Sequence, residues 1–312
     1  MTSTAIAGAR SVSRRHWKTG WWRRERVHVL AITPAALLLA LFFVIPALWA
    51  VYTSMTNLAL LDASARNPQF VGLDNYRRLW NDPDMPKYVR NTVVFVLGAA
   101  VVGQTGVGTA LALLFDHATR LKHKLVGPAF AALMAAWICP PLLTGFIWGR
   151  LLDSRDGVLN TALGGLGFGD VDFLGVHAMT SVIIVEAWRG IAFATLIILG
   201  ALRTIPPDID EAAQVDGARA FARVRDHTLP LLRPALTLVL LMTTINVAGS
   251  FLMILVLTNG DPGRQTETVA LFAFHRAFQF FEVAFGSAIT VLLLAVNLVF
   301  AVIYLALLRE RR

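Results

Sequence analysis

The chain is poor in charged residues and has almost no cysteine. Only 15% of its 312 residues are charged, whereas 56% are hydrophobic. A soluble domain has about 25% charged residues on average, so the composition argues against a soluble protein. The single cysteine, Cys139, excludes a disulfide within the chain.

The sequence also lacks the motifs of an ATPase or a metal site. A phosphate-binding loop ends in Gly-Lys followed by Ser or Thr, and the only Lys before such a residue, Lys18, follows Trp17. No His-Glu-x-x-His or Cys-x-x-Cys occurs, and the seven histidines are scattered. The glycine-rich run 164–169 does not follow a strand, so it indicates a flexible turn. We therefore expect a non-catalytic chain that binds no cofactor. If it transports a solute uphill, the energy must come from a partner or an ion gradient.

What the chain does have is long apolar runs. Runs of 18 or more apolar residues predict transmembrane helices. The first run is too long for the apolar core of a signal peptide and is expected to remain as an anchor. The sequence therefore predicts an all-α polytopic membrane protein with six transmembrane helices, at about 28–53, 89–115, 125–151, 177–202, 234–257 and 284–308.

The distribution of Lys and Arg predicts the orientation in the membrane. With six spans both ends lie on one side, and that side has 18 Lys and Arg near its spans against 7 on the other. Positive residues favour the cytoplasm, so both termini and the loop 203–233 are expected there. The domains are then a basic arm 1–27, a membrane domain 28–308 and a tail 309–312. Trp17, Trp21 and Trp22 suit contact of the arm with membrane lipid, and no nucleic acid is needed to explain the net charge of +8.

A polar cassette lies between the fourth and fifth apolar runs. Pro206-Pro207 stops one helix and can begin another, and Asp208 and Asp210 suit a first helical turn. Gly217 predicts a sharp turn. A second short helix over 218–227 should follow, until Pro230 and Pro234 redirect the chain into span five. Spacing alone is equally typical of an ordinary solvated helical loop.

The same cassette resembles the coupling loop of ABC importer membrane subunits, with E-A-A, three residues, Gly, and then Leu-Pro. The resemblance implies that this loop docks on an ATP-hydrolysing subunit. It departs from the family at His227, where an aliphatic residue is usual. The residues that the resemblance assigns to coupling are Glu211, Ala212, Ala213, Asp216, Gly217, Leu229 and Pro230.

Further stretches resemble carbohydrate-uptake permeases of the maltose and glycerol-3-phosphate importer type. They are F-V-G-L-D-N-Y at 70–76, D-G-V-L-N at 156–160, E-A-W-R at 186–189, L-T-N-G-D-P at 257–262 and F-G-S-A at 285–288. The resemblance implies a bacterial cytoplasmic membrane protein that pairs with a second permease. It also implies two ATPase subunits, which hold ATP and Mg, and an external solute-binding protein.

Two charged residues fall inside the fourth span. Glu186 and Arg189 are three residues apart and thus on neighbouring faces of a helix. An unpaired charge at mid-membrane costs about 2.5–3.5 kcal/mol on an insertion scale. They form either a structural pair or, with Trp188, Gly190 and Phe193, part of a solute pathway.

Span five contributes a polar line through an apolar helix, at Thr243, Asn246, Gly249 and Ser250. Spacings of three and four place these residues on one face. The resemblance to the maltose permease implies sugar contacts in spans four and five, while the alternative is that such residues only join helices together. Asn297 in span six is a third candidate, and Cys139-Pro140-Pro141 predicts a kink in span three.

The most consistent interpretation is a permease subunit of an ATP-driven sugar importer. One alternative is a permease for glycerol phosphate or another polyol, in which Arg189 contacts phosphate. Others are an ion-driven secondary transporter, in which Glu186 carries the proton, and a membrane assembly protein without transport. The last two need no partner-docking loop. The sequence does not name the sugar.

Overall fold

The structure, a computed structural model, describes residues 32–309, with side chains to residue 306. The predicted basic arm 1–27 and residues 310–312 of the tail lie outside the described residues. The chain divides into two compact units, 1–52 and 53–312. Within the described part the regular secondary structure is helical, apart from one isolated bridge between Thr56 and Phe70. The prediction of an all-α fold is confirmed.

The described part holds five helices that are long and apolar enough to cross a membrane, and a sixth span if one bent pair counts as one. The first, Ile32–Ser54, includes the π-helical η1 (Ala40–Val44) and α2 (Ile45–Ser54). The other spans are Met85–Arg120, Val126–Ile138 with Pro141–Leu151, Ala178–Leu202, Ala220–Ala248 and Val283–Ala306.

The second span is continuous despite its glycines. It runs through α4 (Met85–Phe95), the π-helical η3 (Val96–Val107) and α5 (Gly108–Arg120). A Cβ at Gly103 would lie 2.4 Å from the Cβ of Ala187, and one at Gly108 would lie 2.7 Å from that of Ala194. These two glycines therefore allow close packing on the fourth span.

The third span bends where the kink is predicted, at Cys139-Pro140-Pro141, but the bend divides the predicted helix 125–151 into two helices. Helix α6 (Val126–Ile138) and α7 (Pro141–Leu151) are bent by 107°. Cys139 and Pro140 have extended backbones between them. Proline disfavours the α conformation at the preceding residue, so two prolines in succession end α6 and begin a new helix.

The fifth span also differs from the predicted 234–257. Helix α12 (Leu229–Ala248) ends before Gly249, and the short α13 (Leu252–Leu257) follows in another direction. Helix α13 packs on α7 so closely that a Cβ at Gly145 would lie 2.7 Å from Cγ1 of Val256. The breaks in the third and fifth spans thus produce two short helices, α7 and α13, that pack on each other.

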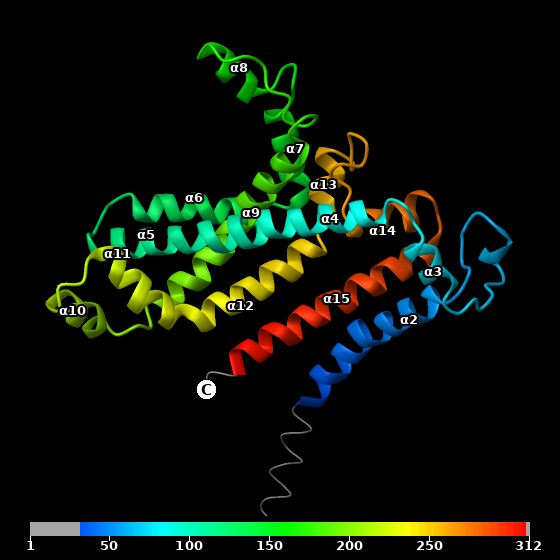
Figure 1. Ribbon diagram of the computed structural model, residues 1–312, viewed down its shortest axis with the longest axis horizontal. Helices are drawn as coiled ribbons and strands as arrows, with labels where there is room; N and C mark the ends of the chain where they lie inside the picture. Colours follow the sequence, from blue (N-terminus) through cyan, green and yellow to red (C-terminus); the bar gives the residue numbers. More distant parts are fainter. Residues whose placement is uncertain (1–31, 310–312) are drawn as a thin grey trace, which may run out of the picture. The chain divides into compact units, whose positions relative to one another are not determined.

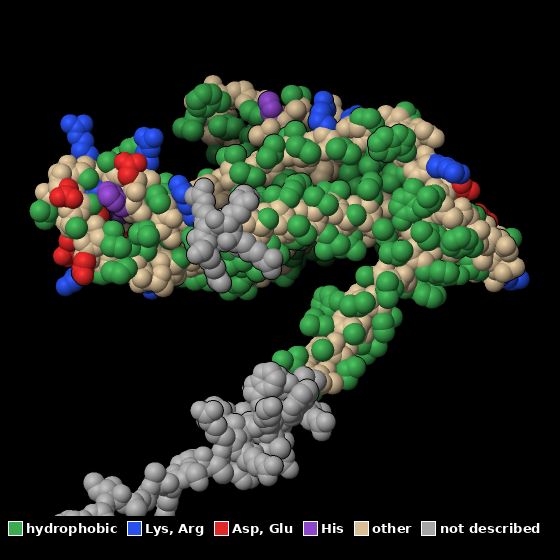
Figure 2. Space-filling model, turned by 60° about the horizontal axis from the view of Figure 1, so that its bottom comes forward, with side chains coloured by type: hydrophobic (Ala, Val, Ile, Leu, Met, Phe, Trp, Pro, Cys, Tyr) green, Lys and Arg blue, Asp and Glu red, His purple; other side chains and the backbone are tan. Residues whose placement is uncertain are grey.

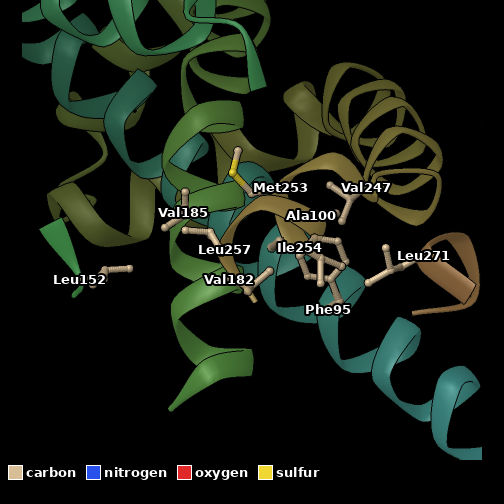
Figure 3. Close-up of a cluster of buried hydrophobic side chains, with 11 residues drawn as sticks. Phe95, Ala100, Leu152, Val182, Val185, Val247, Met253, Ile254, Leu257 and Leu271 are labelled. Carbon is tan, nitrogen blue, oxygen red and sulfur yellow. The ribbon is translucent and has the colours of Figure 1, made fainter. Parts of the chain in front are cut away.

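Helix α9 (Ala178–Leu202) is the central element of the second unit. It packs on η3, α5, α6 and α12. Figure 3 shows apolar side chains of α9 meeting those of α13 and of the second span, with Val182 and Val185 facing Ile254, Leu257 and Phe95. Because so many of its side chains are buried, α9 holds the side chains on its remaining face in fixed positions.

The last span carries a second buried cluster. Helix α15 (Val283–Arg309) packs on α14 (Val269–Phe274) and the π-helical η5 (His275–Gln279). Tyr88 and Phe272 stack with ring centroids 4.4 Å apart. A Cβ at Gly286 would lie 2.6 Å from Cβ of Ala277, so the F-G-S-A stretch is explained by close helix packing.

Two of the stretches that resemble carbohydrate-uptake permeases, 70–76 and 156–160, hold loops in place through an asparagine side chain. In α3 (Asp74–Trp80), Asn75 Nδ2 donates to the carbonyls of Ser54 and Thr56, at 2.8 and 2.7 Å. In α8 (Val158–Gly165), Asn160 Nδ2 donates to the Val171 carbonyl at 2.9 Å and its Oδ1 accepts from the Val171 N–H at 3.0 Å.

The loop beyond α8 is fastened again by Asp172. Its carboxylate accepts hydrogen bonds from the Ser154 hydroxyl and from the Gly175 and Val176 N–H groups. These bonds, the Ser154 hydroxyl first, favour the ionised form and lower the pKa of Asp172. The loop is therefore held by a charged acceptor at neutral pH.

The ends of the second unit differ in composition from its middle. Figure 1 shows α3 and α10 at opposite ends of this unit. Figure 2 shows hydrophobic side chains over the middle of the visible face, with acidic and basic side chains gathered at the end that carries α10. This distribution matches a membrane-spanning body with a polar loop projecting beyond it.

Candidate coupling loop and solute cavity

The polar loop after α9 begins with a well-formed short helix. Helix α10 (Pro207–Val215) starts after Pro206 and has Asp208 and Asp210 in its first turn. Its end is closed by Gly217, whose φ is +78°. The N–H of Gly217 donates to the Gln214 carbonyl and that of Ala218 to the Ala213 carbonyl, both at 3.0 Å. This pair of bonds defines a Schellman motif, so the predicted turn at Gly217 is present.

The second half of the loop differs from the prediction. A short helix does form, as α11 (Ala220–Ala222) and the π-helical η4 (Arg223–Thr228), but it continues into α12 without a break. Pro230 lies in the first turn of α12 and Pro234 inside it, so neither redirects the chain. The wider π turn before Pro230 relieves the clash between a proline ring and the carbonyl four residues earlier.

The residues assigned to coupling differ in exposure. Glu211, Ala212, Asp216 and Gly217 are exposed, whereas Ala213 is buried within the loop at 4% exposure. Leu229 and Pro230 are half-buried in the continuous helix. The unusual His227 is exposed, so it places no polar group in the interior.

Two exposed apolar residues near Gly217 were missed by the sequence reasoning. Val215 is 87% exposed and Phe221 is 76% exposed. They lie on either side of the Gly217 turn, in α10 and α11. Apolar residues inside an otherwise polar cassette were the available signal, since such side chains at an exposed turn indicate a contact surface.

Asp210 ties α10 to two membrane helices. Its Oδ1 lies 3.6 Å from Nε of Arg223 in η4, and its Oδ2 lies 4.0 Å from Nη1 of Arg120 at the end of α5. Within α10, Gln214 Nε2 donates to Oδ2 at 3.1 Å. The orientation of α10 is thus linked through one carboxylate to the second and fifth spans.

A cavity of about 580 Å³ opens between the middle parts of α9 and α12. Five of the predicted pathway residues line it, namely Arg189, Gly190, Phe193, Thr243 and Asn246. The others that line it are Gln104, Trp137, Leu241, Met242 and Ile245.

Gln104 and Trp137 line the cavity but were not identified by the sequence reasoning. Trp137 forms an aromatic pair with Phe193, with ring centroids 5.9 Å apart. A Cβ at Gly190 would lie 2.1 Å from Cδ of Gln104, so this glycine makes room for the amide. Each residue comes from a different span, and only the tertiary packing brings them to α9.

The Glu186–Arg189 pair borders this cavity. Arg189 Nη2 donates to Glu186 Oε1 at 2.8 Å, and the Ser250 hydroxyl donates to Oε2 at 3.4 Å. Gln104 Nε2 donates to the Glu186 backbone carbonyl at 3.1 Å. Glu186 is fully buried, while Arg189 keeps 15% of its side chain exposed. Arg189 Nε has no hydrogen-bond partner among the described residues.

The remaining predicted residues lie outside the cavity wall. Trp188 packs edge-on against Trp148, with centroids 5.5 Å apart, and Gly249 lines a smaller cavity of about 200 Å³ with Phe251 and Phe274. The Ser250 hydroxyl donates to Glu186 and does not line the cavity. Asn297 is half-buried in α15, and its Oδ1 has no partner in the described part of the chain.

The position of Thr243 is consistent with both alternatives for span five, contact with a solute and contact between helices. Its hydroxyl lies 3.2 Å from that of Thr105 and donates to the Val239 carbonyl at 2.9 Å, so it joins helices together. It also lines the cavity.

No group of three or more His, Cys, Asp or Glu in the described part could hold a metal ion.

Comparison with known proteins adds the following. The family model described as "Binding-protein-dependent transport system inner membrane component" matches residues 6–312. The chain is 32% identical to the sulfoquinovosyl glycerol transport system permease protein SmoG of Agrobacterium fabrum, over 91% of this chain and 90% of the relative. It is 31% identical to the trehalose/maltose transport system permease protein MalF of Thermococcus litoralis, over 93% and 96%.

A solved structure shows the same fold. It is that of a bacterial alginate ABC transporter in complex with an alginate-bound periplasmic protein. The TM-score is 0.77 at 18% identity, and the match covers 95% of this chain and 98% of the other.

Proposed function

Because this chain belongs to the family of binding-protein-dependent transport system inner membrane components, we propose that it is one permease of an ATP-driven sugar importer. It forms half of the pathway for a sugar or oligosaccharide and pairs with a second permease. Of two ATPase subunits, which bind ATP and Mg, one docks on its loop, and an external binding protein delivers the solute. The chain itself binds no cofactor.

The observation that carries this proposal is that the cavity and the exposed loop share two helices. Helix α9 ends at Leu202 and α12 begins at Leu229, so the loop joins them directly. Both helices also line the cavity of about 580 Å³. A partner that moves the loop therefore moves the cavity walls, which is the coupling that an importer needs.

The cavity lining suits a carbohydrate. The rings of Trp137 and Phe193 offer flat apolar faces for a sugar ring. Arg189, Gln104 and Asn246 offer hydrogen-bond donors and acceptors for hydroxyl groups. The names of the relatives, which mention sulfoquinovosyl glycerol, trehalose and maltose, support the same class of solute.

The loop surface suits an ATPase partner. Val215 and Phe221 supply apolar contact area. Glu211 and Asp216 add exposed carboxylates, and Ala212 and Gly217 are exposed beside them. The chain lies in a bacterial inner membrane with the loop and both termini on the cytoplasmic side. The ATPase subunits therefore reach the loop from the cytoplasm, and the binding protein docks on the opposite side of the membrane.

Reconstitution tests the proposal. The complete complex is placed in liposomes with ATP inside and the binding protein outside, and uptake of radiolabelled maltose, trehalose or sulfoquinovosyl glycerol is measured. We expect uptake of a sugar that needs both ATP and the binding protein and persists when a protonophore collapses the proton gradient. Uptake that needs the gradient and no ATP would instead establish an ion-driven transporter with Glu186 as the proton carrier.

The Arg189 geometry favours a second candidate solute class. Glu186 occupies one N–H group of the Arg189 guanidinium, and Arg189 also lines the cavity. A guanidinium with unused donors suits a sulfonate, carboxylate or phosphate, so an acidic sugar or a polyol phosphate such as glycerol phosphate is the alternative. Competition between trehalose and sulfoquinovosyl glycerol for uptake distinguishes the neutral from the anionic class.

A further inference from the structure

A separate cavity of about 440 Å³ lies between α5, α6 and α9, at the end of the spans that carries the polar loop. It shares no lining residue with the cavity of about 580 Å³. Its walls are apolar except for Thr119 and Arg203, and they comprise Phe115, Thr119, Val126, Gly127, Phe130, Leu196, Leu199, Gly200 and Arg203.

The inner part of this cavity offers no free hydrogen-bond donor. Phe115 and Phe130 meet edge to face, with ring centroids 5.7 Å apart. The Thr119 hydroxyl donates to the Phe115 carbonyl at 2.6 Å, so its proton is already used. A Cβ built at Gly200 meets no atom within 4 Å, which shows that the space in front of this glycine is open. The inner part therefore suits hydrocarbon.

The outer part of the cavity is cationic. Arg203 is exposed at the C-terminal end of α9 and, unlike Arg120, which pairs with Asp116 at 2.8 Å, makes no ion pair within residues 32–309. Exposed Lys122 and Lys124 lie in the turn between α5 and α6. From Arg203 to Leu196 the wall extends seven residues along α9, or about 10 Å at the rise of a helix.

We infer that this cavity binds an anionic phospholipid of the surrounding bilayer. The headgroup phosphate contacts the Arg203 guanidinium, and an acyl chain lies between Phe115, Phe130 and Leu196. A basic opening over an apolar space between transmembrane helices is the chemistry that recognises anionic headgroups. Charge complementarity favours a phospholipid over an uncharged lipid, and the apolar depth favours a lipid over a free anion.

The site goes beyond the proposed transport function and rests on it for one point only, that this end of the spans faces the cytoplasmic leaflet. Arg203 immediately precedes the loop that leads to α10. A lipid bound there fixes the end of α9 from which the loop departs. Lipid retention is measured without transport or ATP hydrolysis, so failure of the lipid site and failure of the importer proposal are distinguishable.

Native mass spectrometry of the assembled complex tests the inference. The complex is extracted in mild detergent and incubated with equimolar phosphatidylglycerol and phosphatidylcholine, and retained lipids are counted. The variants are Arg203→Gln, which removes the cation, and Gly200→Leu, which fills the open space. Arg233→Gln is the matched charge control, because Arg233 is exposed at the same end in α12 and does not line the cavity. Gly164→Leu in α8 is the control for the added side chain, since its Cβ also meets nothing within 4 Å.

We expect selective phosphatidylglycerol retention by the wild type and by both controls. Retention should be about tenfold weaker in Arg203→Gln, as for loss of one charge-assisted contact, and should also fall in Gly200→Leu. Equal loss in Arg203→Gln and Arg233→Gln would overturn the site in favour of diffuse surface charge. Full retention in Gly200→Leu, or displacement of the lipid by inorganic phosphate at millimolar concentration, would overturn the acyl-chain half of the inference.

Discussion

Arg189 donates to the fully buried carboxylate of Glu186 at 2.8 Å and also lines the cavity. The two roles that the sequence leaves as alternatives, structural pair and solute contact, are therefore geometrically compatible. The pair is also asymmetric, because only Arg189 reaches open space. Removing one partner has a different consequence from removing the other.

The Glu186–Arg189 pair gives the first prediction. Arg189→Gln leaves a buried carboxylate without its cation and should destabilise the complex by about 3–5 kcal/mol, lowering the yield of assembled complex. Glu186→Gln should be milder, since Arg189 still borders the cavity. The double variant Glu186→Gln, Arg189→Gln should restore assembly but not uptake. Yield, melting temperature and sugar uptake are the measurements, and full uptake by the double variant would remove Arg189 from the solute pathway.

Gly217 gives the second prediction. A left-handed conformation costs an L-residue about 1–2 kcal/mol, and no atom blocks a Cβ at this position. Gly217→Val should therefore distort the turn through the backbone alone and reduce both co-purification of the ATPase subunit and solute-stimulated ATP hydrolysis. Gly217→Asn is the control, because Asn tolerates positive φ, and it should retain most of both. Equal activity of the Val and Asn variants would show that the turn is not needed for coupling.

The Asp210 network gives the third prediction. Exposed ion pairs contribute about 0.2–1 kcal/mol, so Asp210→Asn should change stability little. It should nevertheless loosen α10 from Arg223 and Arg120 and lower the amount of solute transported per ATP hydrolysed. Asp208→Asn in the same turn is the matched control, since Asp208 makes no ion pair in the described part. An unchanged transport ratio in Asp210→Asn would contradict a role in positioning the loop.

Membrane orientation gives the fourth prediction. In a Cys139→Ala background, single cysteines at the exposed positions Ala65 and Ala162 should react with an impermeant thiol reagent in intact cells. A cysteine at exposed Ala220 should react only after the membrane is opened. Neither Ala65 nor Ala162 has a side chain that fastens its loop, so the substitutions leave the local bonds intact. Reaction of the Ala220 site in intact cells would invert the orientation and exclude cytoplasmic docking.

The sequence by itself determined the class of protein and the cap of the polar loop. Long apolar runs require helices, because a bilayer leaves no other partner for the backbone. Pro206-Pro207 and Gly217 define where α10 begins and ends through local backbone restrictions. Both signals are local, so they could be predicted from neighbouring residues alone.

The tertiary structure alone decided the cavity and the helical breaks. Gln104, Trp137 and Asn246 are far apart in the chain, and only the packing of their helices around α9 brings them to one wall. Likewise α12 ends at Ala248 and not at the predicted residue 257. The reason is that α13 packs on α7 and the Ser250 hydroxyl donates to Glu186 at the break between α12 and α13. Ala213 is buried within the loop, where α10 packs on η4. Contacts between distant residues set these features, and no local pattern in the sequence encodes them.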